Sequence, residues 1–115
     1  MKRGEIWTVA GGSAYTGKPR PCVIVQEDTF DATQSITICA FTSDAPKAPL
    51  FRVRVEPDEQ NGLGTPSSLM VDKISTVPKA RIGTHIGHLA DEDLLRLNQA
   101  MIVFLGLARS ARTRQ

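Results

Sequence analysis

The stretch Ser35-Ile36-Thr37-Ile38-Cys39-Ala40-Phe41-Thr42 decides the fold class of this chain. Its apolar side chains recur with a period close to two, and it stops at the turn-forming run Ser43-Asp44-Ala45-Pro46. Such alternation predicts a β-strand that places one face in the core. The centre of the chain is therefore expected to be extended.

Further runs with the composition of β-strands lie on both sides of residues 35–42. The two that precede it are Ile6–Ala10, ended by Gly11-Gly12-Ser13, and Pro21–Gln26, which is rich in β-branched residues. Next comes Phe51–Glu56, with Phe51, Val53 and Val55 on one face and Arg52, Arg54 and Glu56 on the other. After a loop at Asn61–Pro66, a strand from Ser68 to Asp72 is expected to run on through Ile74 and Val77 to Pro78. The last extended segment is Ile82–Leu89, which glycines interrupt.

The period changes near the end of the chain, where a helix is expected. Asp91 is the predicted N-cap, and Glu92 and Asp93 complement the positive start of the helix. Apolar residues then recur at helical spacing up to Gly106, namely Leu94, Leu97, Met101, Ile102 and Leu105. Because Leu95, Val103 and Phe104 widen the apolar surface beyond one face, the helix is also expected to contact a second subunit.

Short strands followed by one helix exclude a parallel βαβ sheet, which needs helices between its strands. The architecture predicted is a small, strongly bent antiparallel barrel with a C-terminal helix laid against it. The 115 residues suffice for one domain. No apolar run is long enough to span a membrane. Met1-Lys2-Arg3 is followed by Gly4-Glu5-Ile6-Trp7 rather than by a signal-peptide core, so we expect a cytoplasmic protein.

The charge balance excludes nucleic-acid binding by overall basicity. The chain has 14 basic and 12 acidic residues, but Arg109, Arg112 and Arg114 lie within the last seven, which leaves 11 basic residues elsewhere. A nucleic-acid interface would therefore need a local basic patch. The basic tail is expected to be frayed and solvated.

Cysteine and histidine spacing does not suggest a metal site. Cys22 and Cys39 lack CxxC spacing, and both are expected to be buried in strands as free thiols. His85 and His88 are three residues apart in an extended segment, so they are expected to point to opposite faces. Both are interpreted as structural or surface residues.

Three places along the chain can carry chemistry, and each has a structural alternative. Arg20 lies between Pro19 and Pro21, which restrict its backbone and favour bidentate phosphate binding, although a solvated loop arginine fits as well. Thr42 and Ser43 end a strand and can hold an oxyanion or make a local turn. Asp72 beside Lys73 is either a base or half of an ion pair. Tyr15 can stack on a base or anchor its loop.

These residues together resemble a known family, the MazF/PemK toxins. The likeness begins with Met1-Lys2-Arg3-Gly4-Glu5-Ile6-Trp7 and Lys18-Pro19-Arg20-Pro21-Cys22-Val23-Ile24-Val25, which are similar to the RGEIW-type first strand and the RPVLIV-type second strand. It continues through Phe41-Thr42-Ser43, Leu69-Met70-Val71-Asp72-Lys73-Ile74, the segment Ser75–Ile82 and the terminal helix. The order, the spacing and the total length carry the resemblance.

The resemblance implies the toxin of a type II toxin–antitoxin pair: an SH3-like barrel with a C-terminal helix that cleaves single-stranded RNA at specific sequences without a metal or other cofactor. The family's catalytic arginine falls on Arg20, its strand-end threonine on Thr42 and its acidic residue on Asp72. Lys18, Tyr15, Ser43 and Lys73 are the candidate RNA-binding residues. Asp72 can serve as a base if burial raises its pKa.

The expected partners are a second copy of the chain and an antitoxin with a flexible acidic segment, for which Arg52 and Arg54 are candidate contacts. The expected boundaries are a single domain at residues 1–108 and a tail at 109–115. The chain also departs from the family pattern. The loop before Arg20 is short and lacks the histidine and glutamate of many relatives, and Met70 stands where some have an arginine. Lys18 or Lys73 could supply the missing positive charge.

Two other functions fit a chain of this kind. Gyrase-poisoning toxins of the CcdB type act through a C-terminal Trp-Gly-Ile, whereas this chain has its single tryptophan at Trp7 and ends Arg112-Thr113-Arg114-Gln115. A non-catalytic RNA-binding barrel is the third reading, because the shortened loop removes residues that other members use.

Overall fold

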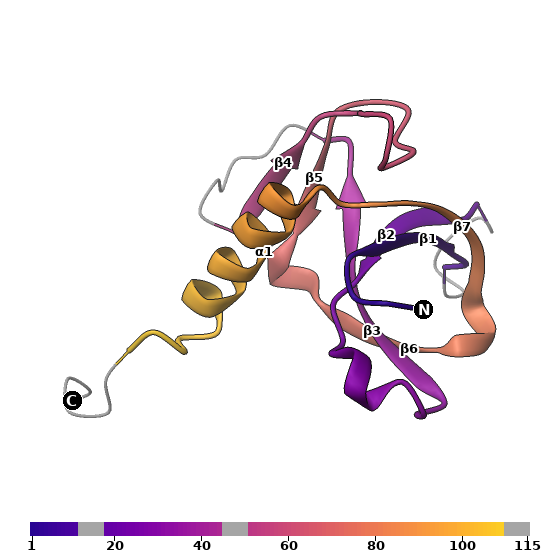
Figure 1. The fold of residues 1–115 in the computed structure, drawn as a ribbon, viewed down its shortest axis with the longest axis horizontal. Helices are drawn as coiled ribbons and strands as arrows, with labels where there is room; N and C mark the ends of the chain where they lie inside the picture. The colour runs from indigo at the N-terminus through magenta and orange to yellow at the C-terminus, as the bar shows by residue number, and fades with distance from the viewer. Residues whose placement is uncertain (12–17, 45–50, 110–115) are drawn as a thin grey trace.

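The fold is described from a computed structural model, over residues 1–11, 18–44 and 51–109. The β-strands within these residues are β1 (Glu5–Val9), β2 (Arg20–Ile24), β3 (Ser35–Thr42), β4 (Arg52–Val55), β5 (Ser67–Met70), β6 (Ser75–Pro78) and β7 (Ile82–His88). The 3-10 turns are η1 (Asp28–Phe30), η2 (Val71–Lys73) and η3 (Lys79–Arg81), and the α-helix is α1 (Asp91–Phe104). The predicted mainly β chain with a C-terminal helix is confirmed (Figure 1).

All the strand pairings are antiparallel, in the order β4-β5-β3-β2-β1-β7, and β6 pairs with β3 outside this path. Strand β3 organises the sheet because one of its edges carries β2, while the other carries β6 near its start and β5 at its end. The sheet curves strongly, and α1 lies against β4 and η2 (Figure 1). Within the described residues the edge strands β4 and β7 do not pair, so this sheet is not closed.

The predicted strand that continues from Ser68 to Val77 is wrong, because η2 divides it into β5 and β6. Leu69 pairs with Phe41 and Ser75 with Ile38, so an advance of six positions on this side matches an advance of three along β3. The surplus is taken up by the turn, where the fully buried Val71 donates its backbone N–H to the Phe51 carbonyl. The other predicted strands match the structure to within about two residues, and β3 matches at both ends.

Helix α1 begins one residue earlier than a cap at Asp91 would require, because Ala90 is the N-cap. Ala90 has extended φ and ψ, and its carbonyl accepts the first helical hydrogen bond from Leu94 N–H at 3.0 Å. The prediction of Asp91 as N-cap is therefore wrong, and Asp91 instead lies in the acidic first turn. The end at Gly106 is confirmed, since that glycine has φ +73°.

The core consists of two clusters of buried apolar residues. The larger lies between the sheet and α1, and Leu97 enters it fully buried with Leu94 and Met101 packed beside it. The smaller contains Val9, Cys22, Ile24, Ile36 and Ile38. Cys22 and Cys39 are buried, free thiols, as predicted, and burial raises the pKa of each to about 12. Of the apolar residues predicted at helical spacing, Ile102 and Leu105 are exposed, and so are Leu95, Val103 and Phe104.

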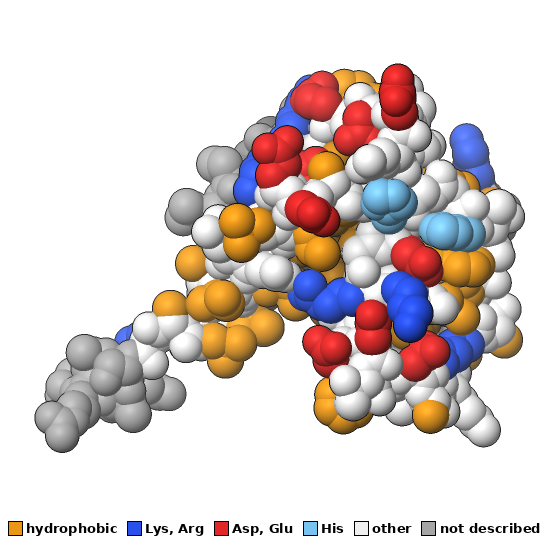
Figure 2. Space-filling model, in the orientation of Figure 1, with side chains coloured by type: hydrophobic (Ala, Val, Ile, Leu, Met, Phe, Trp, Pro, Cys, Tyr) orange, Lys and Arg blue, Asp and Glu red, His pale blue; other side chains and the backbone are white. Residues whose placement is uncertain are grey.

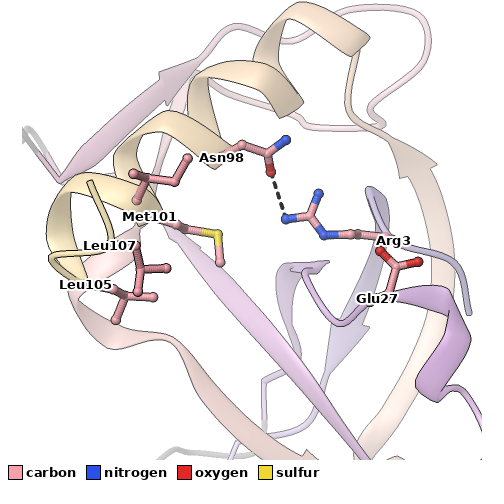
Figure 3. Close-up of a pocket in the computed structure, with 7 residues that line it drawn as sticks. Arg3, Glu27, Asn98, Met101, Leu105 and Leu107 are labelled. Atoms are coloured by element: carbon pink, nitrogen blue, oxygen red, sulfur yellow. Dashed lines mark hydrogen bonds between the residues drawn. The ribbon is translucent and has the colours of Figure 1, made fainter. Parts of the chain in front are cut away.

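Two polar contacts hold the periphery to this core. Arg3 donates from Nη2 to Asn98 Oδ1 at 2.7 Å, which ties the N-terminus to α1 (Figure 3), and from Nε to the Val25 carbonyl at 2.9 Å. Asn61 is fully buried in the loop before β5 and bonds three backbone groups there. Neither role was predicted from the sequence. None of the described helices is long and apolar enough to cross a membrane.

Candidate active site

Arg20 and Thr42 are brought together at one rim of the sheet. Arg20 opens β2 and Thr42 closes β3, and these strands are antiparallel, with Cys22 paired to Ala40 two residues inward. Both residues line a hollow of about 170 Å³. The remaining lining residues are Pro21, Phe41, Ser43, Thr65 and Ser67. The structure thus unites two of the three residues that were expected to be catalytic, together with Ser43.

The backbone of Arg20 is fixed by the sheet. Arg20 is opposite Val9 in the ladder between β1 and β2, and Pro21 is opposite Thr8. Its side chain is exposed. A guanidinium that leaves a strand end from an anchored backbone, with proline on both sides, costs little backbone entropy when it binds an anion. Its planar donors suit two phosphate oxygens at once.

The hydroxyl of Thr42 is oriented by its own turn. Asp44 donates its backbone N–H to Thr42 Oγ1 at 3.2 Å. Because a hydroxyl has one proton and two acceptor positions, this contact occupies an acceptor position and leaves the proton available for a donor role. Thr42 is also held by its pairing with Ser68 in β5. The arrangement suits a hydrogen bond to a non-bridging phosphate oxygen.

The sequence did not point to Thr65 and Ser67, which come to the same hollow from the start of β5. Ser67 is buried and donates its hydroxyl to the Thr65 carbonyl at 3.0 Å. The signal in the sequence is the polar run Thr65-Pro66-Ser67-Ser68 that opens a strand. It becomes informative only once β5 is known to pair with the end of β3.

Asp72 is held elsewhere, and of its two predicted roles, a base or half of an ion pair, the contacts show the ion pair. Arg52 donates from Nε to Oδ1 at 2.8 Å and from Nη2 to Oδ2 at 3.1 Å. This bidentate hydrogen bonding lowers the pKa of Asp72 below its usual range, against the raising effect of burial. The raised pKa that a base role requires is therefore not found. Among the described residues, Asp72 lines a separate hollow with Met101, Phe104 and Leu105.

The other candidate residues are scattered. Lys18 and Lys73 are both exposed, the first just before β2 and the second in η2. Tyr15 lies outside the described residues. The two arginines proposed as partner contacts differ in their surroundings. Arg52 is engaged in the bidentate pair with Asp72, whereas Arg54 is exposed and pairs with Glu56 at 2.9 Å.

The histidines have local contacts. The His85 ring stacks on Trp7 with centroids 4.8 Å apart, and His85 Nε2 lies 2.9 Å from the Gly87 carbonyl. His88 Nδ1 lies 3.3 Å from the Leu89 carbonyl. In residues 1–11, 18–44 and 51–109, no three His, Cys, Asp or Glu side chains gather as a metal site would need.

Comparison with known proteins relates this chain to one group. Residues 2–105 match the family described as the PemK-like, MazF-like toxin of type II toxin–antitoxin systems. The chain is 51% identical to the probable endoribonuclease MazF of Mycolicibacterium smegmatis, over 94% of this chain and 99% of that protein. It is 30% identical to endoribonuclease MazF9 of Mycobacterium tuberculosis, over 93% and 98% of the two chains.

Solved structures show the same fold. A mycobacterial endoribonuclease in complex with its cognate antitoxin superposes with a TM-score of 0.79 at 21% identity, covering 96% of this chain and 99% of that one. A MazE–MazF complex from Deinococcus radiodurans gives a TM-score of 0.76 at 17% identity, over 92% and 96% of the two chains. At these identities the likeness concerns the fold.

Proposed function

The chain belongs to the PemK-like, MazF-like toxins of type II toxin–antitoxin systems and is an endoribonuclease of that family, and from this premise we propose that it cuts single-stranded RNA at specific sequences through Arg20 and Thr42. The observation that carries the proposal is their meeting in one hollow at the rim of the sheet. A guanidinium and a hydroxyl that line one hollow can both donate hydrogen bonds to the oxygens of a phosphodiester.

The reaction proposed is attack of a ribose 2′-OH on the adjacent phosphorus. The new O2′–P bond forms as the P–O5′ bond breaks, which leaves a cyclic phosphate and a free 5′-hydroxyl. The 2′-hydroxyl gives up one proton and the departing oxygen takes one up, so no water is consumed in this step. Arg20 stabilises the charge that develops on the non-bridging oxygens, and Thr42 donates a hydrogen bond to one of them. Neither contribution requires a metal.

Single-stranded RNA is the substrate that fits this rim. Unpaired bases can splay apart and expose their edges, whereas a duplex buries them. Lys18 and Ser43 flank the catalytic pair in the sequence, and both are exposed. We assign them, with Lys73 and Tyr15, to contacts along the RNA. Asp72 is assigned a positioning role, because its carboxylate is committed to Arg52.

The domain organisation follows the family. The strands β6-β3-β2-β1-β7 form one curved path through the sheet. Its two end strands, β6 and β7, follow each other in the chain with only the 3-10 turn η3 between them. We infer an SH3-like barrel over residues 1–108, followed by a basic tail at 109–115. A cytoplasmic location is part of the same proposal.

The C-terminal half of α1 is the surface that we assign to a second copy of the chain. The apolar residues exposed there and just after it are Ile102, Val103, Phe104, Leu105 and Leu107. Figure 2 shows hydrophobic side chains gathered around this end of the helix. Two hollows of about 410 Å³ each adjoin it, and Met101 and Leu105 line both. Contiguous exposed apolar surface of this kind marks interaction sites.

One of these hollows is drawn in Figure 3, where the Arg3–Asn98 contact faces Met101, Leu105 and Leu107. It combines a polar wall with an apolar one, as interfaces between subunits commonly do. The second partner proposed is an antitoxin, because the matching mycobacterial and Deinococcus structures are complexes with antitoxins. A flexible acidic segment would order on the basic rim and exclude RNA from it. Exposed Arg54 is a further candidate contact.

The test is cleavage of a long RNA, mapped by primer extension, followed by cleavage of oligonucleotides that contain the mapped sequence. A single 2′-deoxy substitution at the scissile nucleotide should abolish cleavage, and EDTA should not inhibit it. Arg20→Ala should lose cleavage while the protein stays folded. Arg96→Ala removes the same charge from α1 and should keep it. Cleavage of the 2′-deoxy oligonucleotide, or full activity of Arg20→Ala, would contradict the mechanism.

Neither alternative function gains support. Trp7, the single tryptophan, is stacked on His85 in β7 rather than placed at the C-terminus as gyrase poisons have it. A binding protein without catalysis is disfavoured because the pair of residues that the mechanism uses is present and assembled.

A further inference from the structure

A second hollow lies beside the first, and Arg20 lines both. It too measures about 170 Å³. We propose that this second hollow holds the nucleobase next to the scissile phosphate, and that Arg81 determines which base is accepted there. The proposal rests on the function proposed above, since it needs an RNA phosphate at Arg20.

The floor of the second hollow is apolar. Val9, Cys22 and Ile38 line it from three successive strands, β1, β2 and β3, and each is at most 6% exposed. A surface of this kind offers dispersion contacts to a flat ring but no hydrogen bonds. It suits the face of a nucleobase and does not suit a phosphate. The volume is several times the roughly 30 Å³ that one water occupies in the liquid.

The rim of the hollow is basic. Arg20 enters from the start of β2 and Arg81 from η3, and both side chains are exposed. None of the described residues that line it is acidic. A negatively charged polymer is therefore attracted to this rim, and Arg20 joins the two hollows. A phosphate bound in the first places its own nucleotide at the mouth of the second.

Arg81 is positioned to read the edge of that base. Its backbone carbonyl accepts the Ala10 N–H at 2.9 Å, which holds η3 against the end of β1. A guanidinium has only donors, and its fork matches two neighbouring acceptors such as O6 and N7 of guanine. On the edge that carries these atoms, guanine presents both acceptors and uracil presents O4, whereas adenine and cytosine present an amino donor there, so guanine and then uracil are favoured. Ser75 also lines the hollow and can donate or accept.

The decisive measurement is base preference, because a purely structural arginine would not change it. Once the cut site has been mapped, kcat/KM is measured for substrates that carry each of the four bases on either side of the scissile phosphate. The wild type should prefer guanine or uracil at one of these positions. Arg81→Ala should reduce kcat/KM about 10-fold or more on the preferred base and leave the others nearly unchanged, since a bidentate base contact discriminates by about 1–3 kcal/mol.

Two further variants separate charge from shape. Arg81→Lys keeps the positive charge but loses the fork, so it should retain cleavage and lose most of the preference. Arg96→Ala should keep both rate and preference. Equal loss on all four bases in Arg81→Ala, or an unchanged preference, would overturn the assignment of Arg81.

The two proposals fail in different ways. A wild-type protein that cuts RNA only when the 2′-OH is present, but whose base preference ignores Arg81, contradicts this inference alone. A wild-type protein that does not cut RNA contradicts the proposed function, and this inference with it. Thermal unfolding of each variant confirms that the comparison is made between folded proteins.

Discussion

The Arg52 guanidinium and the Asp72 carboxylate form a bidentate ion pair, with Nε–Oδ1 at 2.8 Å and Nη2–Oδ2 at 3.1 Å. The pair joins the start of β4 to η2, and the two side chains are 19% and 21% exposed. It fixes the turn at which the chain leaves β5 for β6. Of the two roles that the sequence left open for Asp72, a base or half of an ion pair, the structure shows the ion pair.

The first prediction concerns the pH dependence of stability. Since Arg52 lowers the pKa of Asp72 below 3.8, the ion pair stabilises the fold fully above that pH. Its contribution is lost as the pH falls from 3.8 through the lower pKa of the folded state. Asp72→Asn should cost about 1 kcal/mol at pH 7, the upper end for a partly exposed pair. Denaturant unfolding at pH 7 and pH 3 should show this difference shrinking in acid.

The same variant tests the framework role against the catalytic one. Asp72→Asn should keep most of its kcat. Arg52→Ala, which removes the other partner of the ion pair, is the matched variant. A general base contributes about 10²–10⁴-fold to the rate. A loss of that size in Asp72→Asn, accompanied by a change in the acid limb of the pH–rate profile, would return Asp72 to the catalytic residues.

The second prediction concerns Thr42. Thr42→Val keeps the shape of the side chain and removes the hydroxyl, so kcat should fall by about 10²–10³, as when other anion-stabilising donors are removed. Thr42→Ser should recover most of the activity. Thr84→Val, on exposed β7, is the control for a lost hydroxyl. Equal activity in Thr42→Val and the wild type would remove Thr42 from the mechanism.

The third prediction concerns the buried Asn61. Its Nδ2 donates to the Glu56 carbonyl at 2.9 Å, and its Oδ1 accepts from the Leu63 and Asp58 N–H groups at 3.0 and 3.2 Å. Asn61→Ala leaves these backbone groups without partners and should cost about 3 kcal/mol in the free energy of unfolding. Gln99→Ala, exposed on α1, should cost under about 0.5 kcal/mol. A small effect at Asn61 would mean that water replaces its side chain.

The fourth prediction concerns the thiols. Burial raises the pKa of Cys22 and of Cys39 to about 12, so almost no thiolate is present at pH 8. Iodoacetamide should therefore leave the folded protein unmodified for as long as it stays folded, because the thiolate is the reactive form. In denaturant both cysteines should be alkylated, which mass spectrometry reads directly. Rapid alkylation under native conditions would show that a thiol is accessible.

The fifth prediction concerns the apolar end of α1. Val103 is 62% exposed, and Val103→Glu puts a charge into the surface assigned to the second copy. Sedimentation should show a dimer for the wild type and a monomer for this variant, with the helix retained. Gln99→Glu, which adds the same charge on another exposed position of α1, should remain dimeric. A dimer that survives Val103→Glu places the interface elsewhere.

Local sequence patterns were sufficient for most of the fold. Alternation identified β3 to the residue, and helical spacing identified α1, because each element has a buried face with its own period. The break at η2 could not be predicted, since it arises from the different numbers of residues that β3 and its two partners need to stay in register. Asn61 has no such period, and only its backbone partners explain it.

The candidate site was predictable in part for the same reason. Arg20 and Thr42 stand at strand ends, which the sequence marks with prolines and a turn. The contribution of Ser67 and Arg81 depends on which strands are neighbours, and the pairing of Asp72 with Arg52 depends on the position of β4 beside β5. A single sequence does not contain that information in local form.

The ladders among β1, β2, β3 and β5 hold the backbone on which Arg20 and Thr42 stand. Arg81, to which we assign the choice of base, stands in η3 outside those ladders, so its replacement need not disturb them. Such a toxin can acquire a new target sequence during evolution while its bond-breaking apparatus is inherited intact.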